Sequence, residues 1–359
     1  MGVKCLALGS ERETSGRAVE QAHAEALLEV VHVPGDGSLG HTARIRCPDE
    51  AAGIHHGHKA RHLLEFVHGV YCLEKRDYSS TSTVFIPNDA INIVWCMNAA
   101  PSLFISHGAP TFALKPGLLG ANLRTVASRL PEVKAALVVS AHWQSRGSRV
   151  MTTAAPQTLH DFDGFAAELY RLEYRAPGAP ALASQAGRLL AAQGFLVNED
   201  PERGLDHGVW VPMLHLFPDA QVPVFQVSMP YDLDTAGAWR LGRALGPLRD
   251  RGVLIVGSGS LTHNLYEVRQ NRPDTAPYAR EFTGWVREAV LTHDTDRLIR
   301  YRRTAPHAER AHPTEEHYLP LLVAIGASTV GDETPEVIEG DMTYGVLSME
   351  SYAWGMPTA

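Results

Sequence analysis

The sequence has 359 residues, of which 45% are hydrophobic and 20% charged, an ordinary globular composition that suffices for one large domain or two small ones. Its net charge of −8 disfavours binding to nucleic acid or to an anionic membrane surface. No run approaches the roughly 18 consecutive apolar residues that span a bilayer, and the N-terminus has no signal-peptide pattern. We expect a cytoplasmic protein without nucleic-acid or membrane partners, and the sequence carries no signal of its oligomeric state.

The first 96 residues differ from the rest of the chain. They hold one helical pattern, roughly over residues 16–31, and one short apolar run, without a regular alternation of elements. We predict that residues 1–96 are an atypical N-terminal extension, either poorly ordered or upstream of a natural start at Met97. All the cysteines of the chain lie here, at spacings that match neither a zinc ribbon nor a redox motif: Cys5, Cys47, Cys72 and Cys96.

A histidine cluster also lies in this extension, in "GIHHGHKARH". No strand or carboxylate in the sequence organises these side chains, so we interpret them as a chance cluster rather than a functional metal site. Its members are His55, His56, His58 and His62.

From Met97 onward, strand and helix patterns alternate. Apolar, β-branched runs predict strands at 102–106, 135–140, 222–228 and 252–257. Apolar residues at three- and four-residue spacing predict helices near 118–130, 179–194, 235–247 and 278–292. This alternation predicts a single α/β domain over residues 97–359, with a central, largely parallel or mixed sheet flanked by helices. In such a sheet, ligands bind beyond the carboxyl ends of the strands.

Three of these strands are followed by a histidine. His107 ends "SLFISH", His142 lies in "VVSAHW", and His263 lies in "VGSGSLTHN". Parallel strands deliver such residues to one edge of the sheet, where imidazoles held by rigid elements can bind Fe, Zn or Cu. Two further candidates are His207 in "LDHGVW" and His317 in "HPTEEHYLPL", which is expected to open a helix.

Each histidine alone has a simpler interpretation, because a lone histidine after a strand is more often a hydrogen-bonded structural residue. The convergence of three favours a metal or catalytic site at the carboxyl edge of the sheet. We expect His312 to support this site by contacting a ligand histidine. Gly257 and Gly259 suggest a dinucleotide-binding loop, but the third glycine is missing and no helix follows at once, so we reject it.

Together these motifs are similar to those of a known enzyme family. The sequence resembles the DODA-type extradiol aromatic ring-opening dioxygenases, the DOPA 4,5-dioxygenase branch of the class III, LigB-like extradiol superfamily. The resemblance covers about residues 98–355 in the family order. The segments that carry it are "PSLFISHGAPTFAL", "VVSAHW", "LDHGVWVPMLHLFPDAQVPVFQVSM", "GVLIVGSGSLTHNL" and "HPTEEHYLPLLVAIGA".

This resemblance implies a role for each histidine. His107 and His142 match the metal-binding histidines, and His317 matches the position that completes the site, although the neighbouring Glu316 keeps a carboxylate ligand open. His263 is implied to be either a fourth ligand or an acid/base group. His207 matches a histidine that faces the substrate; we take it and His263 as the catalytic residues.

The chemistry of ring opening is consistent with these residue types. Cleavage of a catechol beside its hydroxyls needs a metal that binds both catechol oxygens and O2, which suits Fe(II). Zn(II) has the higher intrinsic affinity for imidazole and can take its place in purified samples. Trp143, Phe162 and Trp210 are candidates for the pocket wall. We expect an Fe(II)-dependent extradiol dioxygenase that cleaves a small, L-DOPA-like catechol with O2. The alternatives are a zinc-dependent hydrolase using the same histidines and a non-enzymatic binding protein on the same fold.

Overall fold

The computed structural model describes residues 27–31, 41–46, 81–86, 99–268, 274–328 and 333–357. These residues belong to two compact units, Met1–Asn98 and Ala99–Ala359. The first unit contains an antiparallel sheet whose strands pair in chain order: β1 (Leu27–Val31), β2 (His41–Arg46) and β3 (Thr81–Ile86).

The helix predicted over residues 16–31 is wrong for its last five residues, which form β1. The segment "LLEVV" pairs along its whole length with β2, and its β-branched valines favour an extended backbone. The rest of that predicted helix and the histidine cluster near residue 58 lie outside the described residues, as does most of the proposed extension.

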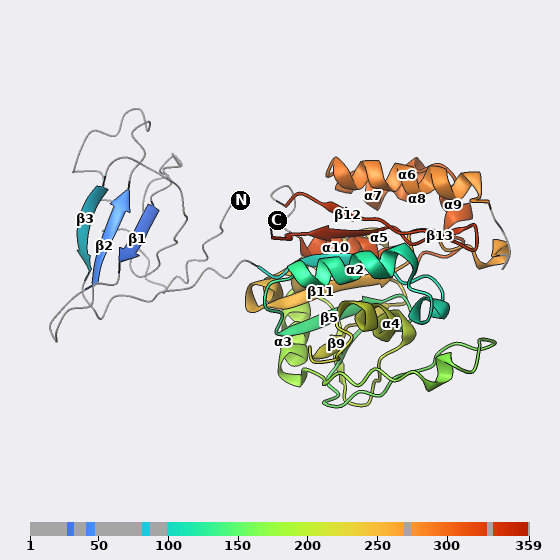
Figure 1. The fold of residues 1–359 in the computed structure, drawn as a ribbon, viewed down its shortest axis with the longest axis horizontal. Helices are drawn as coiled ribbons and strands as arrows, with labels where there is room; N and C mark the ends of the chain where they lie inside the picture. Colours follow the sequence, from blue (N-terminus) through green and yellow to red (C-terminus); the bar gives the residue numbers. More distant parts are fainter. Residues whose placement is uncertain are drawn as a thin grey trace. The chain divides into compact units, whose positions relative to one another are not determined.

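A six-stranded sheet forms the centre of the second unit, in the order β12-β15-β4-β11-β5-β9 (Figure 1). Neighbouring strands from β4 to β9 are parallel, whereas β15 runs antiparallel to both β4 and β12. The prediction of a largely parallel or mixed sheet is thus confirmed, although the third predicted strand is shorter than expected. The strands are β4 (Ser102–Ser106), β5 (Ala135–Ser140), β9 (Val224–Gln226), β11 (Val253–Gly259), β12 (Glu336–Ile338) and β15 (Ser351–Trp354).

Small strands extend the domain beside this sheet. They form three two-stranded sheets, β6 with β10, β7 with β8, and β13 with β14. Their bounds are β6 (Gln144–Ser145), β7 (Ser148–Met151), β8 (Val197–Asp200), β10 (Met229–Pro230), β13 (Met342–Thr343) and β14 (Leu347–Ser348).

The four helices that the spacing predicts are all present: α2 (Gly117–Arg129), α3 (Pro180–Ala192), α5 (Thr235–Leu245) and α6 (Pro277–Leu291). A further helix, α4, was not predicted, because its sequence "HGVWVPMLHL" is apolar on nearly every side and contains Pro212. The remaining helices are α4 (His207–Leu216), α7 (Thr295–Ile299), α8 (Tyr301–Thr304), α9 (Ala308–Ala311) and α10 (Leu319–Ala327).

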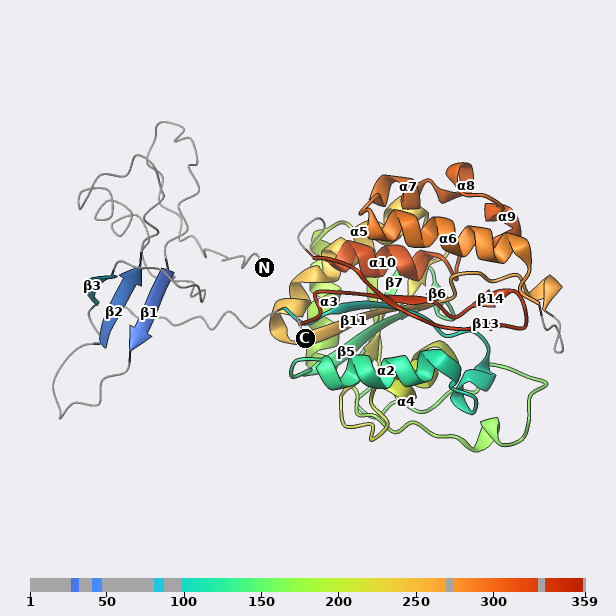
Figure 2. The same cartoon turned by 45° about the horizontal axis from the view of Figure 1, so that its top comes forward.

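Helices cover both faces of the large sheet. Figure 2 shows α2 and α4 on one side of β5 and β11, with α5 and α10 on the other. Helix α10 is buried along its whole length because it lies between the sheet and α5. Two glycines allow α5 and α10 to pack this closely, since a Cβ on Gly242 would lie 2.0 Å from the Val323 carbonyl oxygen and one on Gly326 would lie 2.1 Å from that of Trp239.

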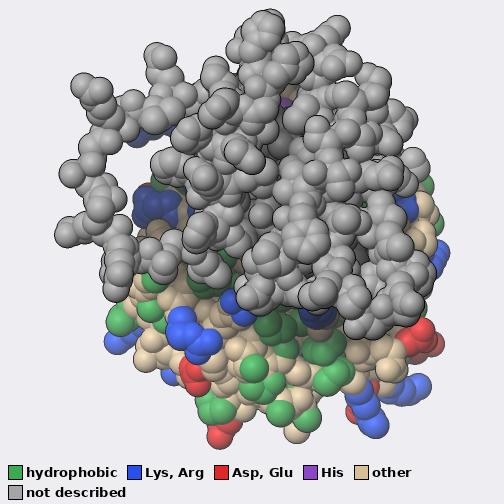
Figure 3. All heavy atoms as spheres, turned by 90° about the vertical axis from the view of Figure 1, so that its left-hand side faces the viewer, with side chains coloured by type: hydrophobic (Ala, Val, Ile, Leu, Met, Phe, Trp, Pro, Cys, Tyr) green, Lys and Arg blue, Asp and Glu red, His purple; other side chains and the backbone are tan. Residues whose placement is uncertain are grey.

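The surface of the described residues carries charges of both signs. On the coloured part of the face in Figure 3, basic and acidic side chains are interspersed with apolar ones. Within the described ranges, no helix has the length and apolar character needed to cross a bilayer.

Candidate metal centre

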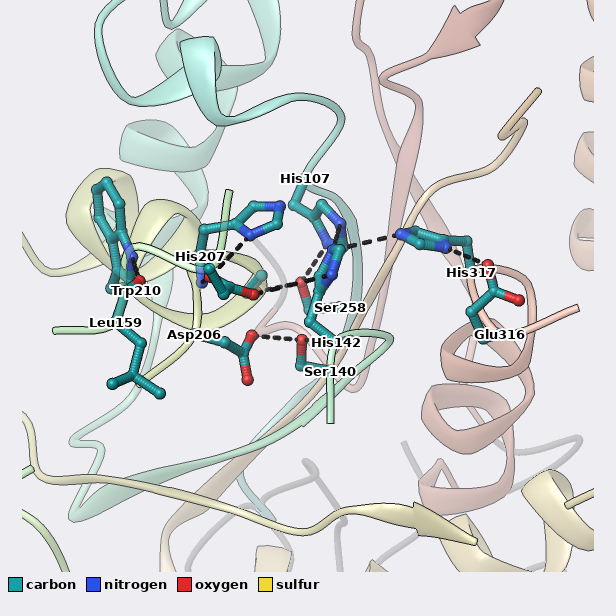
Figure 4. A network of polar contacts seen from close by, with 12 residues as sticks. His107, Ser140, His142, Leu159, Asp206, His207, Trp210, Ser258, Glu316 and His317 are labelled. Carbon is teal, nitrogen blue, oxygen red and sulfur yellow. Dashed lines mark hydrogen bonds and ion pairs between the residues drawn. The ribbon is translucent and has the colours of Figure 1, made fainter. Parts of the chain in front are cut away.

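Three histidines from separate elements converge at the carboxyl edge of the large sheet. His107 follows β4 directly and His142 lies two residues beyond β5, on either side of β11. His317 lies two residues before α10. Figure 4 shows the three imidazoles directed toward one another. His107 and His142 thus lie at the carboxyl edge of the sheet, as expected for residues that follow parallel strands.

The distances between these three rings fit one bound metal ion. His142 Nε2 lies 3.0 Å from His107 Nε2 and 3.3 Å from His317 Nε2. Nitrogens about 2.1 Å from a common ion are about 3.0 to 3.4 Å apart in octahedral or tetrahedral geometry. Within the described part of the chain, these rings form one of three groups whose ligand atoms lie close enough to hold a metal. We call His107, His142 and His317 the histidine trio.

The outer ring nitrogens of His107 and His317 donate hydrogen bonds, so the inner nitrogens of these two rings are unprotonated. Ser258 uses its hydroxyl proton to donate to the Gly208 carbonyl, so its oxygen accepts from His107 Nδ1–H at 2.9 Å. The Glu316 carboxylate accepts from His317 Nδ1–H at 2.9 Å. Both rings therefore present an unprotonated Nε2 to the centre, and a single proton on His142 Nε2 cannot satisfy both neighbours. A cation between the three nitrogens resolves this conflict.

Burial keeps the trio neutral, as metal binding requires. Removal from water holds the pKa of His107 and of His317 well below the usual value of 6.5, and repulsion between the neighbouring rings lowers it further. Burial and the nearby His207 lower the pKa of His142 to about 3, although the Asp161 carboxylate opposes the shift. Neutral imidazoles are good ligands for Fe, Zn and Cu.

Two glycines of β11 let the His317 segment approach the sheet. A Cβ on Gly257 would lie 2.0 Å from the Pro320 carbonyl oxygen, and one on Gly259 would lie 2.2 Å from that of His317. The backbone N–H of Ser260 donates to the same His317 carbonyl at 3.0 Å. The "VGSGS" segment thus serves close backbone packing that positions His317, which agrees with the rejection of a dinucleotide loop.

His207 lies beside the trio at the first turn of α4. Its ring centroid is 4.0 Å from that of His142 and 5.5 Å from that of His107. Asp161 Oδ1 accepts from both the His207 backbone N–H, at 2.8 Å, and His207 Nδ1, at 3.0 Å. Burial disfavours ionisation of Asp161, but hydrogen bonds and charge from His207 outweigh it and lower the pKa of this carboxyl to about 2.

The start of α4 is tied to the end of β5. Asp206 is fully buried, and its carboxylate accepts from Ser140 Oγ at 2.7 Å and from Arg203 at 2.9 Å. Burial raises the pKa of this carboxyl despite these bonds. A Cβ on Gly208 would lie 2.4 Å from Ser140 Oγ and 3.0 Å from His142 Cδ2. Glycine is therefore needed for α4 to approach the metal centre.

His263 reaches the same edge but is not part of the trio. Its ring stacks on that of His317, with centroids 3.4 Å apart and an interplanar angle of 11°. Rings stacked in parallel direct their nitrogen lone pairs along separate planes, so His263 and His317 do not point at a common ligand position. Burial lowers the pKa of His263 to about 4. This stacking favours the acid/base role of His263 over the fourth-ligand role.

Of the three aromatic residues expected in the pocket wall, Phe162 contacts a site histidine. It is half-buried and meets the His207 ring edge-on at 5.6 Å. Trp210 is fully buried behind it and donates from Nε1 to the Leu159 carbonyl at 3.0 Å (Figure 4). Trp143 is buried under the Arg203 guanidinium, 4.9 Å from its ring centroid.

Two supporting contacts differ from the sequence-based expectation. His312 does not contact a ligand ring; it donates to the Leu261 carbonyl at 2.9 Å and thereby supports the loop that carries His263. Glu316 and Ser258 hold the outer nitrogens of the trio instead. Asp161 and Ser258 were not predicted as site residues, because nothing in their local sequence signals a contact with a distant histidine.

These features define a class of protein: an α/β protein with a three-histidine centre at the carboxyl edge of a mainly parallel sheet. The profile of the LigB family, described as the catalytic LigB subunit of aromatic ring-opening dioxygenase, matches residues 119–353. A protein named 4,5-DOPA dioxygenase extradiol from Beta vulgaris is 40% identical over 261 residues, which cover 71% of this chain and 96% of that protein.

Further relatives agree with this match. A protein of the same name from Escherichia coli (strain K12) is 35% identical. The match covers 74% of this chain and 98% of that protein. The crystal structure of an uncharacterized Escherichia coli K12 protein matches with a TM-score of 0.60 and 32% identity, over 71% of this chain and 99% of that one. The chain therefore belongs to the LigB family and is an extradiol ring-cleaving dioxygenase. Membership of this dioxygenase family rules against the two alternatives left open by the sequence, a zinc-dependent hydrolase and a non-enzymatic binding protein.

Proposed function

We propose that the protein uses Fe(II) and O2 to cleave the ring of a small catechol, such as L-DOPA, beside its two hydroxyls. The observation that carries this proposal is the trio, in which three neutral imidazoles share one focus and leave the remaining coordination positions open. Relatives named 4,5-DOPA dioxygenase extradiol support the catechol class.

His107, His142 and His317 would hold the metal through Nε2. When bound, a metal with open positions lowers the pKa of the catechol hydroxyls and brings the catechol oxygens and O2 together. Fe(II) suits this chemistry, whereas Zn(II) binds imidazole more tightly and is expected to occupy the site in protein purified without added iron.

The remaining histidines would move protons. His207 lies beside His142 and His107, with Nδ1 hydrogen-bonded to Asp161, so its Nε2 is free to accept a proton from a catechol hydroxyl. His263, stacked on His317, is the second acid/base candidate. Phe162 would pack against the catechol ring beside His207.

The test is anaerobic reconstitution with Fe(II), followed by O2 uptake and visible spectra on addition of L-DOPA and simpler catechols. A yellow ring-opened product formed with one O2 consumed per catechol would support the proposal. A filled metal site without O2 uptake for any catechol would refute it.

Three variants separate the proposed roles. His107→Ala and His142→Ala should lose both the metal and turnover, because each removes one of three ligands. His207→Ala should keep the metal and lose about 10²- to 10⁴-fold in kcat, the usual contribution of a general acid or base. Equal loss of metal in all three variants would contradict this division.

We also propose that residues 97–359 are the catalytic domain of a cytoplasmic enzyme and that residues 1–96 are an appended extension. The match of the family profile to residues 119–353 supports this division. Intact-mass analysis of protein from its native source tests whether the extension is part of the natural chain, and ring cleavage by residues 97–359 expressed alone tests the domain boundary.

A further inference from the structure

The Asp161 carboxylate makes a two-point contact with His207 and also lies beside a member of the trio. Oδ1 accepts from the His207 backbone N–H at 2.8 Å and from the ring Nδ1 at 3.0 Å. Oδ2 lies 3.9 Å from His142 Nδ1. One carboxylate therefore touches both the first residue of α4 and a histidine of the trio, at the end of β5.

The backbone around Asp161 is held to the segment that leads into α4. Leu159 donates its N–H to the Leu205 carbonyl at 2.7 Å, and Leu205 donates to the Gln157 carbonyl at 2.8 Å. Trp210, one turn into α4, donates to the Leu159 carbonyl at 3.0 Å (Figure 4). The two backbone bonds join the segments just before Asp161 and His207, and the Trp210 side chain adds a bond from beyond His207. Together these contacts fix the position of the carboxylate relative to the ring.

The contact also determines which nitrogen of His207 carries the proton. An ionised carboxylate only accepts hydrogen bonds, so Nδ1 must be the protonated nitrogen of the neutral ring. Nε2 is then bare and lies on the side of the ring away from the carboxylate. Figure 4 shows this side of the His207 ring turned toward His107. The ring can therefore accept a proton at the trio without a prior change of tautomer or orientation.

We propose that Asp161 is a positioning residue that holds His207 in the Nδ1–H tautomer, with Nε2 facing the trio. This inference rests on the proposed acid/base role of His207 and assigns to Asp161 the orientation of that base. The arrangement parallels the serine-protease histidine, whose buried aspartate sets the tautomer of the base and whose Asp→Asn variant loses about 10⁴-fold in kcat. Here the aspartate is partly exposed, so the expected loss is about 10²-fold.

The decisive variant is Asp161→Ala, which removes the oxygen that accepts from both the His207 backbone N–H and the ring Nδ1. With Fe(II)-loaded enzyme and L-DOPA, we expect kcat to fall about 10²-fold while KM and metal content stay within about twofold. Asp163→Ala is the matched control, because Asp163 lies on the same loop, is exposed, and within the described residues accepts only from the Gly164 N–H at 2.8 Å. It should behave as wild type.

A double variant tests whether Asp161 acts through His207. If it does, Asp161→Ala combined with His207→Gln should be no slower than His207→Gln alone. Losses that multiply, or loss of metal from Asp161→Ala, would overturn the proposal in favour of a role through His142. An unchanged kcat in Asp161→Ala would overturn it outright.

Nuclear magnetic resonance gives a readout that does not depend on turnover. Long-range proton–nitrogen spectra of zinc-loaded, histidine-labelled protein should report a single Nδ1–H tautomer for His207 in wild type and a mixture of Nδ1–H and Nε2–H tautomers in Asp161→Ala, with His207→Gln identifying the signal. The same tautomer in both proteins would refute the inference. If wild type cleaves no catechol, the proposed function fails, whereas the tautomer result still decides the role of Asp161.

Discussion

Replacing Ser258 with alanine tests whether hydrogen bonding behind the trio contributes to metal binding. Ser258 Oγ accepts from His107 Nδ1–H and donates to the Gly208 carbonyl. Ser258→Ala removes both bonds in a fully buried position of β11. His107 then loses the group that fixes its tautomer, and its Nε2 is no longer held as the bare nitrogen facing the centre.

The magnitude follows from these two lost bonds. Loss of the group that hydrogen-bonds a metal-binding histidine typically lowers metal affinity 10- to 100-fold, which is about 1.4 to 2.7 kcal/mol. Two buried polar groups left without partners should also lower the free energy of unfolding of the metal-free protein by about 1 to 3 kcal/mol each. Zinc affinity is measured by competition with a chromogenic chelator, and stability by urea unfolding without metal.

Ser260→Ala is the matched control. Ser260 is also fully buried at the same end of β11, and its hydroxyl donates to the Thr262 carbonyl at 2.9 Å without touching a ring of the trio. It should lower the free energy of unfolding by about 1 to 3 kcal/mol, because it leaves one buried group without a partner, and leave metal affinity unchanged. Wild-type affinity in Ser258→Ala, or an equal loss of affinity in Ser260→Ala, would refute a specific role for the contact with His107.

Two further predictions concern backbone packing and pH. Gly259→Ala would place a Cβ 2.2 Å from the His317 carbonyl oxygen. Since such contacts need about 3.3 Å, the His317 segment must shift by about 1 Å, and we expect at least tenfold weaker metal binding. In the control Gly284→Ala, the new Cβ meets nothing within 4 Å, so this variant should bind metal normally. Burial lowers the pKa of His312 to about 3, so the unfolded chain takes up this proton first and stability falls as pH drops below 6.5, by up to about 1.4 kcal/mol per pH unit. His312→Gln cannot take up this proton and should flatten the decline between pH 6.5 and 4 in urea unfolding; equal slopes would contradict the prediction.

The strands and the site edge were predictable because both depend on local pattern. Short β-branched runs bounded by turn residues correspond to β4, β5 and β11, and parallel strands end at a common edge. Helix α4 was missed for a physical reason: it is buried on almost every side, so its sequence has no polar face to give a helical period.

The sequence by itself determined that histidines follow the strands of an α/β sheet, and so that they meet at one edge. Only the tertiary structure decided which nitrogens face the centre, because that depends on contacts such as His107 with Ser258, 151 residues apart, and His207 with Asp161, 46 residues apart. It also decided that His263 stacks on His317 rather than joining the trio. Strand periodicity is a local property, whereas tautomer and ring orientation depend on partners that only the packed chain brings together.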